Sequence, residues 1–295
     1  MRRINPTHGL TLLFLIGLIL LVLFFRNQIP LWRTLLWRYA LGAGVLLVLK
    51  RCSDRGVMGG RVGKFIYDFT PVLYIIVIYE SLGDLTQYLH PDVDPQLIRI
   101  DFLLFGVHPT VWMERWIVPW LTDVLSVAYL SYFFLPARLV HTLYLKNPRR
   151  DFDLAAFVLL LVWYVSYVGY ILFPAIGPRF TLAHLQSAPL NGSFITDVVN
   201  HLINVAEHNK RDCFPSGHTA IALIVLPLSY RYARLLFYLF CPMVGALILS
   251  TVYLRHHYVI DLFAGAALAA GCSIIGPRLY RWWEAGGGQE KGEAC

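Results

Sequence analysis

The chain has 295 residues, of which 57% are hydrophobic and only 15% are charged, and its mean hydropathy is +0.58. This composition excludes an ordinary soluble domain, in which about 45–50% of residues are apolar and about 25% are charged. The formal net charge is +7 at pH 7. Because the basic residues gather in alternate loops, as described below, we attribute this charge to membrane topology and not to nucleic-acid binding.

Apolar segments near the ~20 residues that a bilayer core requires recur along the chain. The first follows Arg2 and Arg3 as a signal peptide would, but no small-residue cleavage site comes after it. The expected fold is all-α, a polytopic membrane helical bundle of about eight transmembrane helices in one domain over residues 1–285. Residues 286–295 are expected to be a disordered tail. The expected spans are residues 8–25, 34–49, 65–83, 116–145, 154–173, 218–232, 235–254 and 258–277.

Loop charge predicts the orientation of these spans, because short cytoplasmic loops accumulate Lys and Arg. Basic clusters lie near residues 2–3, 50–64, 146–150, 231–234 and 278–281. We therefore expect both termini in the cytoplasm and two long outer loops, residues 84–115 and 177–214. Residues 96–112 are amphipathic and are expected to lie in the outer membrane interface.

Cysteine usage argues against a disulfide framework or a zinc site. The five cysteines are odd in number and scattered, with no Cys-x-x-Cys spacing. Cys213 lies near the polar segments described next, and its predicted role is apolar packing. We expect neither a metal nor an organic cofactor.

Polar residues occur where three of the expected spans begin or end on the outer side. Pro215-Ser216-Gly217-His218 opens the span at 218–232, Arg255 to Asp261 open the span at 258–277, and Arg179 follows the span at 154–173. The predicted topology brings all three segments to one membrane face. A helix that opens with Ser216 and Gly217 offers free backbone N–H groups and a positive dipole end, which suit a phosphate oxyanion.

The residue types predict a phosphoryl-transfer site. His257 and Asp261 are four residues apart on one helix face, so the carboxylate could orient the imidazole as a nucleophile and stabilise its positive charge. His218 is the expected general acid for the leaving oxygen. Arg179 and Arg255 are expected to bind the non-bridging phosphate oxygens.

These motifs resemble the type 2 phosphatidic acid phosphatase superfamily, which includes lipid phosphate phosphatases and the inositol phosphorylceramide synthase branch. The resemblance implies a six-helix core and a metal-independent phosphohistidine mechanism. The chain departs from the common pattern at Leu172, Phe180 and the Ser250-Thr251 pair. Its closest similarity is to the inositol phosphorylceramide synthase branch, carried by the segments 177–179 and 253–258.

The sequence therefore predicts an integral membrane enzyme that hydrolyses or transfers the phosphate group of a lipid at the extracytoplasmic face. Its expected partners are a lipid phosphate, the bilayer and an acceptor that is either water or an alcohol. Three alternatives stay open at this point. They are a serine hydrolase built on Ser216 and His257, a metal hydrolase built on His218, His257 and Asp261, and a transporter using Asp68, Glu80 and Asp123.

Overall fold

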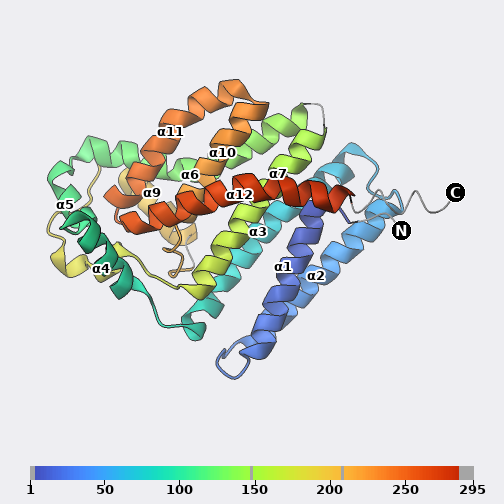
Figure 1. Cartoon of the computed structure of the whole chain (residues 1–295), viewed down its shortest axis with the longest axis horizontal. Coiled ribbons are helices and arrows are strands. Elements are labelled where there is room, and N and C mark those ends of the chain that lie inside the picture. Colours follow the sequence, from blue (N-terminus) through green and yellow to red (C-terminus); the bar gives the residue numbers. More distant parts are fainter. Residues whose placement is uncertain (1–3, 147–148, 207–208, 286–295) are drawn as a thin grey trace.

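The computed structural model describes residues 4–146, 149–206 and 209–285, with residues 202–206 described by their backbone alone. The predicted disordered tail, residues 286–295, lies outside the described residues. All regular structure within the described ranges is helical (Figure 1). The α-helices are α1 Pro6–Phe24, α2 Trp32–Asp54, α3 Arg61–Leu89, α4 Asp94–Phe105, α5 Pro109–Trp112, α6 Pro119–Leu145, α7 Arg149–Leu172, α8 Pro178–Thr181, α9 Thr196–Ala206, α10 Gly217–Tyr232, α11 Arg234–Tyr253 and α12 Val259–Ala285, and two short 3₁₀ helices are η1 Met113–Trp116 and η2 Ala183–Leu185.

Each of the eight expected spans is a helix, and the all-α membrane bundle is confirmed. Six helices are long and apolar enough to cross a bilayer: α1, α3, α6, α7, α11 and α12. Helix α10 has 16 residues, which is about 24 Å of helix against a hydrocarbon core of ~30 Å. Helix α2 is long enough, with 23 residues, but carries charged residues at both ends.

The long helices run back and forth, so their ends form two opposite faces of the bundle. Arg149 bonds Asp68 at one face, where α3 and α7 begin. Tyr79 in the C-terminal half of α3 donates to Asp212, which lies shortly before α10, toward the other face. We call this second face the α4 end because α4 and α5 lie there, whereas the start of α1 and the end of α12 lie at the opposite side of Figure 1.

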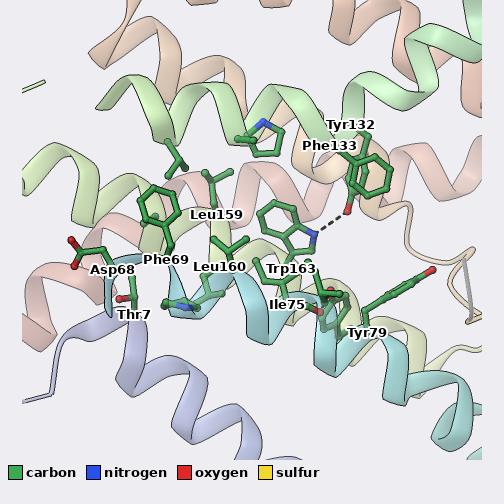
Figure 2. A pocket seen from close by; sticks show the side chains of 18 of the residues that line it. Thr7, Asp68, Phe69, Ile75, Tyr79, Tyr132, Phe133, Leu159, Leu160 and Trp163 are labelled. Carbon is green, nitrogen blue, oxygen red and sulfur yellow. Dashed lines mark hydrogen bonds between the residues drawn. The ribbon is translucent and has the colours of Figure 1, made fainter. Parts of the chain in front are cut away.

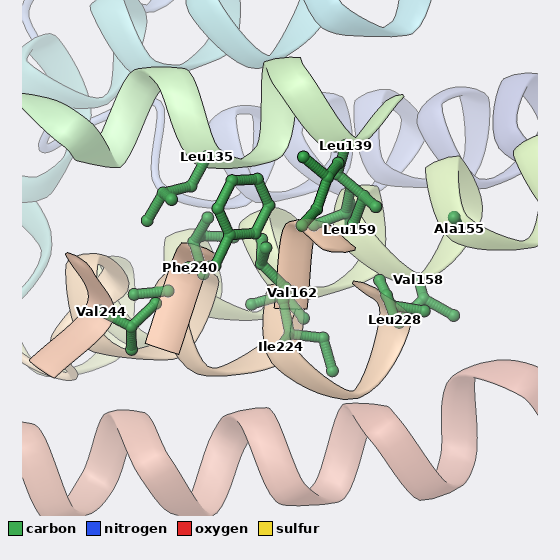
Figure 3. Close-up of a cluster of buried hydrophobic side chains, with 14 of the residues drawn as sticks. Leu135, Leu139, Ala155, Val158, Leu159, Val162, Ile224, Leu228, Phe240 and Val244 are labelled. Carbon is green, nitrogen blue, oxygen red and sulfur yellow. The ribbon is translucent and has the colours of Figure 1, made fainter. Parts of the chain in front are cut away.

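The main core surrounds α10, which packs against α6, α7, α11 and α12. Buried aliphatic side chains from four helices meet there, as Figure 3 shows for Leu139, Val162, Ile224 and Val244. Helix α12 approaches α10 closely at Gly265, where an added Cβ would lie 2.5 Å from the Ser216 carbonyl oxygen. This close approach brings the first turns of α10 and α12 together.

Helix α4 supplies most of the expected interfacial segment, and it places its side chains in an unusual way. Leu103 is 72% exposed and Phe102 47% exposed, whereas Asp94 and Asp101 are each only 2% exposed. The apolar face therefore points away from the protein, as in a helix that lies at a membrane surface. The two carboxylates point inward.

Candidate active site

The segment that carries His257 is set by the way α11 ends. The Thr251 carbonyl accepts the backbone N–H groups of His256 and His257 at 2.9 and 3.0 Å. Arg255, which lies between Thr251 and the two histidines, has a φ of +65°. This left-handed conformation costs a non-glycine residue roughly 1–2 kcal/mol. This tight turn closes α11 and directs the two histidines back toward α10.

His218 and His257 contact each other directly. His218 Nδ1 lies 3.2 Å from His257 Nε2. His257 Nδ1 lies 2.8 Å from the carbonyl oxygen of Cys213, which can only accept, so Nδ1 carries the proton. The lone pair of His257 is then on Nε2, the atom that faces His218. Since 3.2 Å leaves no room for a third group between these nitrogens, a bound phosphate must move the rings apart.

Asp261 is close to His257, but it is not the main partner of the ring. Its Oδ2 lies 3.4 Å from His257 Nδ1, farther than the Cys213 carbonyl. The same oxygen accepts the Cys213 thiol at 2.9 Å and the Tyr258 N–H at 2.8 Å. Asp261 therefore caps α12 and organises the Cys213 turn that orients His257. The structure gives Cys213 a positioning contact that the sequence analysis missed, beyond the packing role expected there.

Two tyrosines of α6 hold the imidazoles in place. The His218 ring stacks with Tyr129 at a ring-centroid distance of 4.5 Å, and it lies tilted against Tyr132 at 4.3 Å. Tyr129 also stacks with His256 at 4.4 Å. Burial lowers the pKa of His256 to about 3, and the nearby His257 and Arg179 act in the same direction. His256 is therefore neutral at physiological pH, which leaves the positive charge of the site to other groups.

A pocket of about 300 Å³ opens beside the histidine pair. Side chains of both charge signs line it: Arg179 and Lys210 are basic, and Asp212 is acidic. Burial raises the pKa of the Asp212 carboxyl, an effect opposed by the hydrogen bond from Tyr79. An anion can thus be bound between basic side chains and the two histidines. The lining residues are Tyr129, Ile176, Arg179, Phe180, Asn209, Lys210, Asp212, Cys213, His218, His256 and His257.

The loop that presents Arg179 depends on Gly177 and Asp94. Gly177 has a φ of +88°, and a Cβ there would lie 2.8 Å from the His256 carbonyl oxygen. Asp94 accepts the N–H groups of Ile176 and Gly177, each at 2.9 Å, and the Tyr258 hydroxyl at 2.8 Å. One buried carboxylate thereby joins the Arg179 loop to the residue that follows His257.

Asp101 fixes the first turn of α12 in the same way. Its two oxygens accept the N–H groups of Val259 and Ile260, each at 2.8 Å. Asp94 and Asp101 are seven residues apart and so lie on one face of α4. Both residues lie in the segment 84–115 that the sequence analysis expected to be an outer loop, and it assigned neither to the site. Their spacing within an amphipathic segment is the signal that could have found them.

We predict that Asp94→Asn lowers both stability and turnover. The amide can accept at one oxygen only and leaves a buried N–H without a partner, which destabilises a fold by about 1–3 kcal/mol. Thermal unfolding in detergent and kcat/KM would measure the two effects. Asp84→Asn is the matched control, since Asp84 is partly exposed and pairs with Arg38 at 3.3 Å; such pairs contribute about 1 kcal/mol or less. Equal losses in the two variants would rule out the positioning role of Asp94.

Three of the expected phosphate contacts do not lie in the pocket. Arg255 Nη2 donates to Glu114 at 2.7 Å and to the Ala188 carbonyl at 2.6 Å. The left-handed turn at Arg255 is the physical reason, because it directs the guanidinium away from the histidines. Ser216 is buried and its hydroxyl accepts the Thr219 N–H, as in an N-cap. Gly217 packs against Tyr170.

Three side chains could hold a metal ion. Ligand atoms of Cys213, His257 and Asp261 lie within 4.8 Å of one another, and all three residues are buried. This set differs from the expected alternative in having Cys213 in place of His218. The thiol already donates to Asp261, and His257 Nδ1 donates to a carbonyl, so a metal would have to replace both bonds.

The fold and this histidine site define a helical membrane protein with a histidine pair beside a pocket at the α4 end of the bundle. The family model of the PAP2 superfamily matches residues 95–275, and the chain belongs to this superfamily. A PA-phosphatase related-family protein of Dictyostelium discoideum is 25% identical over 177 residues, which are 52% of this chain and 32% of that protein. The chain thus covers about a third of the length of this relative. No solved structure matches the chain.

Proposed function

We propose that this protein is a membrane enzyme that cleaves a lipid phosphate through a phosphohistidine on His257. The observation that carries the proposal is the pair of imidazoles, 3.2 Å apart, at the wall of a pocket with basic side chains. Membership of the PAP2 superfamily supports phosphoric ester chemistry in general. The membrane helices support a lipid as the substrate.

In the first step, His257 Nε2 attacks phosphorus while the bond to the ester oxygen breaks. His218 gives its proton to the departing alkoxide, which leaves as an alcohol. Arg179 and Lys210 neutralise charge on the non-bridging oxygens, where it is spread in phosphoryl transfer. Asp261 acts on His257 through the Cys213 turn and by its negative charge.

In the second step, water or an alcohol loses its proton to neutral His218 and attacks phosphorus. The N–P bond breaks and restores His257. When water attacks the phosphohistidine, the product is inorganic phosphate. When the phosphoryl group on His257 carries its own substituent, attack by a lipid alcohol or an inositol-like alcohol gives a new phosphodiester. The motif pattern at residues 177–179 and 253–258 favours the transferase as the alternative reaction.

We further propose that the α4 end faces the extracytoplasmic side, because the basic loops lie at the opposite end.

A substrate panel tests this proposal. Membrane-impermeant short-chain lipid phosphates and phosphodiesters are added to sealed cells, with and without alcohol acceptors, and free phosphate and new phosphodiester are measured. We expect turnover from outside, inhibition by vanadate, a mimic of the transition state, and no inhibition by chelators. Inhibition by a chelator would instead favour a metal site at Cys213, His257 and Asp261. Inhibition by a serine-directed fluorophosphonate alone would favour Ser216.

A further inference from the structure

The side chains of the site are fixed to the bundle in different ways. His218 belongs to α10 and lies against Tyr132 of α6, whose hydroxyl accepts the Trp163 indole N–H of α7 at 2.9 Å (Figure 2). Neighbouring helices therefore support the proposed general acid. Arg179 lies instead in the four-residue helix α8, and His257 lies in the turn between α11 and α12. These short segments depend on other contacts for their relative position.

Arg255, in the turn that carries the nucleophile, binds three acceptors from distant parts of the chain. Its Nη2 donates to Glu114 Oε1 at 2.7 Å and to the Ala188 carbonyl oxygen at 2.6 Å. Its Nη1 donates to Gln186 Oε1 at 3.2 Å. The side chains of Arg255 and Glu114 are only 9% and 11% exposed. Because the guanidinium is planar and rigid, a movement toward the pocket would break all three bonds.

Glu114 holds the same distant segment through its backbone. The carboxylate accepts the Ser187 N–H at 3.2 Å, the Ser187 hydroxyl at 2.9 Å and the Ala188 N–H at 3.4 Å. We call residues 186–188 the strap. Both members of the Glu114–Arg255 ion pair thus bind the strap, and each also binds the other.

Gln186 connects the strap to two parts of the pocket wall. Its Nε2 donates to the Pro178 carbonyl oxygen at 2.9 Å, while its Oε1 accepts from Arg255 at 3.2 Å. Pro178 precedes Arg179 in the chain, and Arg255 lies two residues before His257. A continuous set of hydrogen bonds therefore joins the segment of the pocket cation to the segment of the nucleophile.

We propose that the buried Glu114–Arg255 ion pair holds Arg179 at its correct distance from the nucleophile, and that its guanidinium does not bind the substrate phosphate. The inference rests on the proposed function, to which it adds two positioning residues that act through the strap. An ion pair suits this role, because charge-assisted hydrogen bonds from a guanidinium have a defined direction.

Two variants of Arg255 separate this role from the alternatives. Arg255→Lys keeps the charge but lacks the planar fork that binds three acceptors. Arg255→Gly removes the side chain and keeps the turn, because glycine adopts a positive φ readily. We expect each variant to lower kcat/KM by about 10²-fold, the effect of a displacement of about 1 Å near a reacting group.

Near-wild-type activity in either variant would overturn the proposal. If Arg255→Lys were active, the residue would act as a point charge, as a direct phosphate contact does. If Arg255→Gly were active, only the left-handed turn would matter. Thermal unfolding in detergent is measured in parallel, because a buried charge that has lost its partner destabilises a protein strongly.

A neutral double variant separates stability from positioning. Glu114→Leu combined with Arg255→Gly leaves no unpaired charge, so its Tm should exceed that of Arg255→Gly alone. Its kcat/KM should remain low, because the strap is no longer held. Activity that returned together with Tm would show that the ion pair only stabilises the fold, and would overturn the proposal.

The effect of Arg179 reads the positioning itself. In the neutral double variant, Arg179→Gln should lower kcat/KM about tenfold less than in the wild type, because a displaced cation contributes less. Equal effects in both backgrounds would overturn the proposal. Asp54→Asn is the matched control, since Asp54 pairs with Lys50 at 2.5 Å where α2 ends. It should change neither kcat/KM nor the effect of Arg179→Gln.

Hydrogen exchange reads the strap without turnover. The backbone N–H groups of Ser187 and Ala188 donate to Glu114, so their exchange should be about tenfold faster in the neutral double variant. Exchange within α10 should stay as in the wild type. Unchanged exchange of the strap would overturn the proposal. A protected strap in a wild type that turns over no lipid phosphate would disprove the proposed function and leave the strap contacts standing.

Discussion

Replacing His257 by Gln is expected to abolish the phosphoenzyme and to lower turnover by about 10⁴-fold or more, as loss of a covalent nucleophile does in other enzymes. His257 Nε2 is the nitrogen with the free lone pair, because Nδ1 donates to the Cys213 carbonyl at 2.8 Å. Gln can keep a donor near Cys213 but offers no nucleophile. Rapid quenching at alkaline pH after mixing with ³²P-labelled lipid phosphate measures the trapped phosphate.

His141→Gln is the control for this experiment. His141 lies in the last turns of α6, at the end of the bundle opposite to α4, and is exposed. This variant should trap as much phosphate as the wild type. Equal labelling of the His257→Gln variant and the wild type would show that another residue is the nucleophile. It would end the phosphohistidine proposal for His257.

Replacing His218 by Gln should lower turnover of lipid phosphates by about 10²- to 10⁴-fold, the usual contribution of a positioned general acid. The loss should be much smaller with an aryl phosphate such as 4-nitrophenyl phosphate. A nitrophenolate leaves without a proton, so the acid contributes little to that reaction. Measuring kcat/KM with a series of leaving groups gives a steeper dependence on leaving-group pKa in the variant.

A purely structural role of His218 predicts a different pattern. His218 lies 3.2 Å from His257 and between Tyr129 and Tyr132, so its removal could displace the nucleophile. Displacement would slow alkyl and aryl phosphates by the same factor. An equal loss for both leaving groups would therefore assign His218 to positioning and not to proton transfer.

Much of the fold could be predicted from apolar periodicity. All eight expected segments are helices, although α10, with 16 residues, is too short to cross a bilayer alone. The prediction that the segments of Arg179, His218 and His257 meet at one end also agrees with the structure, in which all three residues line one pocket. Their chemical roles remain predictions.

The contacts within the site were less predictable. His257 and Asp261 are four residues apart, yet the closest partner of the ring is the Cys213 carbonyl, 44 residues away in the chain. Asp94 lies in an expected outer loop, yet it is 2% exposed and joins two segments of the site. The partners of both residues depend on how distant helix ends pack, so the local sequence does not identify them; for Asp94 it offers only the seven-residue spacing from Asp101 within an amphipathic segment.

The amino-acid sequence by itself determined the helical membrane bundle and the end at which its polar segments gather. Long apolar segments must satisfy their backbone hydrogen bonds within each helix, and successive helices must reverse direction. Only the tertiary structure decided which polar side chains face the pocket. That choice depends on backbone direction in the loops, where one left-handed residue, Arg255, turns its guanidinium toward Glu114 and leaves Arg179 and Lys210 as the cations beside the histidines.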